Sequence, residues 1–204
     1  DLTAVLDSFG SIQQRKINCF ETSVFLNRGN IFERLELPSV AQWSPTSSIN
    51  VADFDVDGRE DLFLSQNWYS IRPDLGRLDS SAGVILLGQG DGTFKPVTPA
   101  RSGLAVLGES RNAVVTDFDR DGRSDIMATQ TLGQAQLYLG QSRNRGIRIN
   151  FIDNGIQAKY IGCSVRLIYP NGTGSPRRWF HSGDGVLAQC VLEQVLGFEE
   201  WPVS

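Results

Sequence analysis

Histidine is almost absent from this sequence, which argues against most hydrolytic enzymes. The single histidine, His181, stands in a His-Ser-Gly-Asp-Gly stretch that resembles a catalytic triad at first sight. Triad members come together from distant parts of a fold, so adjacency in the sequence is no evidence for one. We therefore interpret His181 as a polar turn residue and expect no catalytic residues in this chain.

Long apolar runs and an even number of cysteines are also missing. The longest aliphatic run is Val84–Leu87, far below the ~20 residues that cross a membrane, so we expect no membrane insertion. Of the three cysteines, Cys163 and Cys190 lie in one region and either pair or stay as buried thiols, while Cys19 is left over. The chain lacks an initiator methionine and a signal peptide, which indicates a mature chain or a fragment.

The remaining composition is that of a globular protein rich in turns. In 204 residues, 40% are hydrophobic and 21% are charged, enough for one or two domains with a core. The 21 glycines and 8 prolines favour short strands and turns over long helices. The net charge is only -4, and nothing in the charge pattern indicates a nucleic-acid partner.

Two copies of one acidic motif stand out. Each reads Asp-Phe-Asp-x-Asp-Gly-Arg-x-Asp, and its aspartates are Asp53, Asp55, Asp57 and Asp61 in the first copy and Asp117, Asp119, Asp121 and Asp125 in the second. Calcium takes roughly six to eight oxygen ligands, which short Asp side chains on a tight turn supply. Gly58 and Gly122 fall where the turn must bend sharply, and the backbone carbonyls of Arg59 and Arg123 add a ligand each. The motif predicts two Ca²⁺ sites.

Two other interpretations of these loops were compared. Plain acidic surface turns also contain Asp and Gly, but recurrence at a fixed period favours calcium. An EF-hand needs a Glu at position twelve, where this chain has Leu64 and Ala128. The flanks are instead predicted strands, at Ile49–Ala52, Leu62–Leu64, Ala113–Thr116 and Ile126–Ala128. We therefore expect loops that join two strands, with the ninth-position Asp in place of the Glu.

The repeat extends beyond the acidic loops. A predicted strand follows the ninth-position aspartate of each loop, Asp61 or Asp125, and Asp1–Val5 resembles these two strands. Each of the three is followed by an apolar strand that ends in a Gly-bearing turn, at Phe25–Gly29, Leu86–Phe94 and Leu137–Gln141. A period of about 60 residues with several short strands is typical of a β-propeller blade. We expect the aromatic residues beside the intervening loops to pack between blades; they are Trp43, Trp68 and Tyr69.

The pattern changes near residue 143, which predicts two domains, 1–142 and 143–204. The second part has no acidic loop, but its alternating residues predict strands at Ile147–Phe151, Cys163–Tyr169 and Arg177–Phe180. Asn171-Gly172 predicts a hairpin turn, although Asn171-Gly172-Thr173 is also a glycosylation sequon. The whole chain is therefore expected to be all-β.

These residues together resemble known families. The aspartate loops and the Leu87-Gly88-Gln89-Gly90-Asp91-Gly92-Thr93-Phe94 stretch resemble FG-GAP or VCBS repeats, which build the calcium-binding β-propellers of integrin α-subunit heads and many secreted bacterial proteins. The segments Arg145–Ile149, Tyr160–Leu167 and His181–Gln189 resemble the ASPIC/UnbV module. The resemblance implies a partial β-propeller of about two and a half blades and a small β module, truncated at both ends. Open propeller edges would invite association with another chain.

Calcium and the resemblance lead to one main functional expectation. Loops of this kind are filled where Ca²⁺ is millimolar, so we expect an extracellular adhesion or binding module with structural Ca²⁺ sites and a protein or glycan ligand. The alternative is a Ca²⁺-dependent secreted hydrolase or lyase that acts on polysaccharide. Carboxylates that hold a metal are unavailable as bases, which favours the binding module.

Overall fold

The computed structural model describes residues 16–69, 76–144, 146–151, 157–183, 185, 188–189, 191–198 and 201–203. Within these ranges the chain is built almost entirely of antiparallel strands, which confirms the all-β prediction. A four-residue helix, α2 (Pro99–Ser102), and the 3-10 turns η1 (Ser39–Gln42) and η2 (Gln157–Tyr160) are the helical elements described. No described helix has the length and apolar character needed to cross a membrane.

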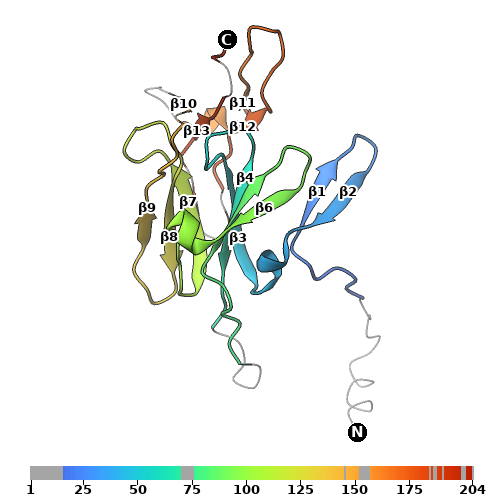
Figure 1. The fold of residues 1–204 in the computed structure, drawn as a ribbon, viewed down its shortest axis with the longest axis vertical. Helices are drawn as coiled ribbons and strands as arrows, with labels where there is room; N and C mark the ends of the chain where they lie inside the picture. The colour runs from blue at the N-terminus through green and yellow to red at the C-terminus, as the bar shows by residue number, and fades with distance from the viewer. Residues whose placement is uncertain are drawn as a thin grey trace.

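Two antiparallel sheets form the body of the molecule (Figure 1). The first sheet runs β3 (Thr46–Ala52), β4 (Asp61–Gln66), β5 (Val84–Gly88) and β6 (Phe94–Val97) in chain order. The second runs β7 (Ser110–Thr116), β8 (Asp125–Gln130) and β9 (Gln136–Tyr138). In register, Ala52 faces Asp61 and Thr116 faces Asp125. Each acidic motif is therefore the hairpin connection between the first two strands of a sheet, as predicted.

The sheets stack because β4 is buried on both faces. Successive strand residues point to opposite faces of a sheet, so Leu62 and Leu64 enter one core and Phe63 the other. The first core contains Leu37, Ala41, Leu62, Leu64, Val84 and Leu86. The second contains Phe63, Leu104, Val106, Ala113, Ile126 and Ala128. The first sheet is thus held between the second sheet on one face and η1 with the chain before it on the other.

The innermost strands of the two sheets lie side by side. Asn50 Nδ2 on β3 donates a hydrogen bond to the Ala113 carbonyl on β7 at 2.9 Å, and Ser47 Oγ donates to the Ser110 carbonyl at 2.6 Å. A separate hairpin, β1 (Ser23–Asn27) with β2 (Phe32–Glu36), stands on the far side of the first sheet (Figure 1). Sheets arranged with their first strands together and their last strands apart form part of a β-propeller.

The C-terminal elements gather at the end of the sheets that carries the aspartate loops (Figure 1). Strand β10 (Ile147–Asn150) pairs with β13 (Glu193–Leu196), and β11 (Ser164–Val165) pairs with β12 (Arg178–Trp179). Phe151 stacks on Tyr160 with 4.1 Å between ring centroids and meets Phe180 edge-on at 4.6 Å. This part of the chain therefore has a small apolar cluster of its own.

Some local predictions were wrong. The segment expected as a strand over Cys163–Tyr169 contributes only Ser164 and Val165 to a sheet, and beyond them Ile168 forms an isolated bridge with Gly174 where the chain turns back through Asn171-Gly172. That turn forms as predicted.

Two tryptophans expected between blades are instead exposed. Trp43 is 59% exposed and Trp68 is 44% exposed. Trp43 caps the end of η1 and Trp68 lies just past the end of β4, so neither is on a core-facing strand position. Cys163 is an exposed free thiol rather than a buried or paired one. The expected strand at Asp1–Val5 and Cys190 lie outside the described residues.

Candidate metal centres

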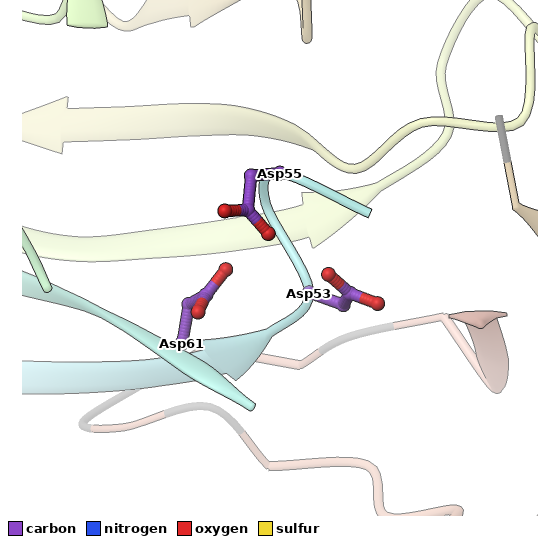
Figure 2. A group of neighbouring side chains, drawn as sticks. All are labelled: Asp53, Asp55 and Asp61. Carbon is purple, nitrogen blue, oxygen red and sulfur yellow. The ribbon is translucent and has the colours of Figure 1, made fainter. Parts of the chain in front are cut away.

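Three of the four aspartates in each motif converge at the end of their sheet. Ligand oxygens of Asp53, Asp55 and Asp61 all lie within 4.8 Å of one another. Figure 2 shows the carboxyl groups of Asp55 and Asp61 turned toward each other, with Asp53 beside them. In the second loop the corresponding oxygens come from Asp117, Asp119 and Asp125, also within 4.8 Å. The two centres are therefore built in the same way from the same motif positions.

Two buried aspartates shape the first loop through backbone hydrogen bonds. Asp53 accepts hydrogen bonds from the N–H groups of Asp57 at 3.0 Å and Gly58 at 2.8 Å. Asp61, which is fully buried, accepts from Phe54 and Gly88, each at 2.8 Å. These bonds draw the loop around the first and last positions of the motif, and both Asp61 oxygens and Asp53 Oδ1 each accept one of them, which leaves these oxygens a second lone pair.

The second loop repeats this pattern bond for bond. Asp117 accepts from the N–H groups of Asp121 at 2.9 Å and Gly122 at 3.0 Å. Asp125 accepts from Phe118 at 2.7 Å and Gly140 at 2.8 Å. The hydrogen-bond pattern is therefore a property of the motif and does not depend on the blade that contains it.

The backbone of each loop enters the left-handed region twice. The predicted bend at Gly58 has φ +90° and that at Gly122 has φ +83°. The residues two positions earlier, Val56 at φ 60° and Arg120 at φ 63°, are also left-handed, which is costly for a β-branched side chain such as valine. Backbone strain of this kind is of order 1–3 kcal/mol and concentrates at functional sites. Nothing in the motif predicts the left-handed backbone conformation of Val56.

The fifth-position aspartates lie outside the converging groups. Asp57 accepts from the Arg59 N–H at 2.8 Å and pairs with the Arg59 guanidinium at 3.0 Å. Asp121 pairs with the guanidinium of Arg123 in the same way. The side chain of Arg59 therefore folds back onto its own loop. Arg59 and Arg123 are half-buried in the loops, and a ligand role for their carbonyl oxygens stays a prediction.

Burial raises the pKa values of aspartates in both loops, and neighbouring carboxylates add to the effect for Asp55, Asp61 and Asp125. Burial raises the pKa of Asp53 to about 6, against the opposing effect of its backbone hydrogen bonds. Burial also raises the pKa of Asp61 to about 7, and the neighbouring charges of Asp55 and Asp53 add to this. The pKa of Asp55 is raised by burial and by Asp57, and that of Asp125 by burial. A cation between these groups would favour their ionised forms.

The donor set suits a hard cation. Among the described residues, Asp55 Oδ1 and Asp121 Oδ1 are buried without a hydrogen-bond partner, and a buried acceptor left unpaired costs about 1–3 kcal/mol. Every converging group is a carboxylate, and all-oxygen sites select calcium or magnesium over metals that prefer nitrogen or sulfur ligands. The residues present therefore fit the predicted calcium ions.

A cavity of about 630 Å³ lies between the two sheets, within the range of roughly 300–1,000 Å³ typical of ligand sites. Apolar residues from both sheets line it, together with Arg101 and Arg143; the apolar residues include Phe54, Ile85, Leu104, Ile126 and Tyr138. It also reaches Asp55 in the first metal loop. No sequence pattern revealed this cavity, because its walls come from separate repeats.

Residues of the C-terminal part also contact both loops and were missed by sequence reasoning. The Gly197 N–H donates to Asp53 Oδ2 at 3.0 Å, and Arg178 pairs with Glu60. Glu193 accepts from the Asp117 N–H at 3.0 Å. These contacts join segments that are far apart in the chain, and no motif in the C-terminal part predicts them.

Comparison with known proteins supports the repeat assignment. Residues 72–128 match the family described as FG-GAP-like repeat. Over 175 residues the chain is 27% identical to Cartilage acidic protein 1 of Homo sapiens and to that of Mus musculus, covering 82% of this chain and 25% of each relative. The chain thus spans about a quarter of the length of these curated relatives. The matched repeat and these distant relatives point to a non-enzymatic structural or binding module.

Proposed function

We propose that this chain is a calcium-stabilised, extracellular binding module. The observation that carries the proposal is the twofold occurrence of three converging carboxylates beside a buried carboxylate oxygen with no partner among the described residues. Asp53, Asp55 and Asp61 would hold one ion, and Asp117, Asp119 and Asp125 the other. Asp57 and Asp121 would join them by exchanging their arginine partners for the metal.

The bound ions would act structurally. Calcium supplies positive charge that offsets the mutual repulsion of the buried carboxylates. The aspartates then fix the turn through their backbone hydrogen bonds and thereby set the register of β3 against β4 and of β7 against β8. Carboxylates committed to these tasks are not available for acid–base chemistry, which agrees with the non-enzymatic assignment.

Ligand binding is proposed at the cavity between the sheets. Its apolar walls offer buried contact area, and the described residues provide no acidic partner for Arg101 or Arg143 at its rim. Two guanidinium groups favour a ligand that carries carboxylate or sulfate groups. An acidic protein or an acidic glycan meets this requirement.

Two further features belong to the proposal. Millimolar Ca²⁺ outside cells would fill loops of this type, and the similar protein Cartilage acidic protein 1 is named after cartilage. The resemblance of the C-terminal part to the ASPIC/UnbV module suggests that such a module packs against the loop end of the propeller. Open propeller edges remain candidate sites of association.

Calorimetric titration of the chelated protein with Ca²⁺ tests the metal proposal. We expect about two equivalents to bind and the melting temperature to rise in calcium relative to chelator, since a ligand at 100 times its dissociation constant stabilises by about 2.7 kcal/mol. The Asp55→Asn/Asp119→Asn double variant serves as the control and should lose both effects. An unchanged melting curve and no heat of binding for the wild-type chain would identify the loops as plain acidic turns.

A further inference from the structure

The strand β13 lies across both aspartate loops, although it belongs to the C-terminal part of the chain. Glu193, at its first position, contacts the second loop, and Gly197, the residue after its end, contacts the first. We propose that β13, together with Arg178 of β12, positions both metal centres, so that calcium binding and the docking of this strand are coupled. The inference rests on the calcium sites proposed above and deepens them.

At the first loop, Gly197 approaches so closely that no side chain fits. Its N–H donates to Asp53 Oδ2 at 3.0 Å, the same oxygen that accepts from the Gly58 N–H. A Cβ on Gly197 would lie 2.5 Å from the carbonyl carbon of Val56 and 2.7 Å from the Gly58 nitrogen. The strand therefore presses directly on the left-handed segment of the loop and helps to hold Asp53 in place.

Arg178 adds a charged contact to the same loop. Its side chain is only 6% exposed and pairs with Glu60, the residue before the ninth-position aspartate. Its Nη2 also donates to the Gly58 carbonyl at 3.4 Å. The guanidinium therefore binds both sides of the loop bend and contributes positive charge close to Asp53 and Asp57.

At the second loop, Glu193 acts through its carboxylate. One oxygen accepts hydrogen bonds from the Asp117 N–H and the Thr116 hydroxyl, each at 3.0 Å. The other pairs with Arg148 of β10 at 2.5 Å, and this pairing leaves Arg148 Nε 3.8 Å from Asp117 Oδ2. Glu193 therefore fixes the start of the loop and also keeps the Arg148 charge from pairing fully with a metal-site aspartate.

Coupling between sites is reciprocal. If β13 holds Asp53 and Asp117 in their positions, removing its contacts must weaken calcium binding, and removing calcium must loosen β13. Outer contacts that orient metal ligands typically change metal affinity about 10- to 100-fold when mutated. Because Gly197 and Glu193 touch different loops, each change should act on one site and spare the other.

The test is calcium titration of the full chain as wild type, Gly197→Ala, Glu193→Gln and the control Gly183→Ala, whose added Cβ meets nothing within 4 Å. We expect Gly197→Ala to weaken one of two bound ions about 10- to 100-fold. Glu193→Gln should weaken the other by a similar factor, because Arg148 is then released to pair with Asp117. Gly183→Ala should match the wild type.

Hydrogen exchange supplies a readout independent of affinity. In the wild type, calcium should slow exchange of the β13 amides relative to chelator, and Asp55→Asn/Asp119→Asn should abolish this difference. Glu193→Gln conserves shape, so it decides the question even if Gly197→Ala does not fold. The inference is overturned if Glu193→Gln binds both calcium ions with wild-type affinity. It is also overturned if the wild-type chain binds calcium but hydrogen exchange of its β13 amides does not change. A wild-type chain that binds no calcium would instead overturn the proposed function.

Discussion

Replacing Asp55 with asparagine should destabilise the protein only when calcium is present. In the first loop Asp55 Oδ1 is buried without a hydrogen-bond partner among the described residues, and burial together with Asp57 raises the Asp55 pKa. An amide of the same shape removes a charge that is poorly accommodated without metal. In chelator we therefore expect the free energy of unfolding to stay the same or to rise slightly.

The expected change in calcium follows from mass action. At 100 times its dissociation constant, an ion that binds only the folded state stabilises it by about 2.7 kcal/mol, and Asp55→Asn should forfeit this amount at its loop. Asp61→Asn is the matched comparison. Asp61 accepts from the N–H groups of Phe54 and Gly88 at 2.8 Å each, and an amide NH₂ would face one of these donors. That costs about 1–3 kcal/mol with or without metal.

Urea unfolding of the wild type and both variants, in calcium and in chelator, separates the two cases. The difference between the two conditions should shrink for both variants, but only Asp61→Asn should also lose stability in chelator. If Asp55→Asn is equally destabilising in both conditions, its carboxylate holds the loop by itself and the metal argument fails. If neither variant alters the response to calcium, the first loop binds no ion.

Three further outcomes are expected. Phe63→Ala should cost about 3–5 kcal/mol in urea unfolding, because Phe63 is fully buried between the sheets; a loss below about 1 kcal/mol would contradict the stacked arrangement. In chelator the free energy of unfolding should fall as pH rises from about 4 to about 7. The reason is that the folded pKa values of Asp53 and Asp61, about 6 and about 7, exceed their unfolded values. A free energy of unfolding that does not change with pH would refute this. Asp57→Ala/Asp121→Ala should lose bound calcium while the fold persists, and unchanged metal stoichiometry would show that these carboxylates never join the sites.

The sequence predicted the loops well because their geometry is local. Strand alternation, the glycine bend and the spacing of the aspartates all act within nine residues, and the structure places the motif at the hairpin from β3 to β4. Asp57 shows the limit of this approach. Spacing alone cannot decide whether a carboxylate converges with its neighbours or pairs with the guanidinium two residues later, and the structure shows the second arrangement.

Contacts over long sequence separations account for what the sequence could not predict. The hydrogen bond from Gly197 to Asp53 spans 144 residues, and that from Asp117 to Glu193 spans 76. Glycine and glutamate are common residue types, and nothing nearby marks these two. Trp43 and Trp68 show the opposite error: large aromatic residues are often buried, but Trp43 stands at the end of η1 and Trp68 just past β4, and both are exposed.

The two loops share a motif, yet their surroundings give them different chemistry. In the first loop, Asp53 accepts a hydrogen bond from the Gly197 N–H, and Arg178 brings a positive charge to the loop through its pair with Glu60. In the second loop, the Asp117 N–H donates a hydrogen bond to the Glu193 carboxylate, and Arg148 lies close to the Asp117 carboxylate. Hydrogen-bond donors stabilise the ionised carboxylate. A guanidinium competes with a cation most directly where it lies against a metal-site aspartate, as Arg148 does at 3.8 Å from Asp117, whereas Arg178 pairs with Glu60. Identical motifs therefore need not bind calcium equally, and the difference arises from residues of β10, β12 and β13 and from Gly197, all in the C-terminal part of the chain.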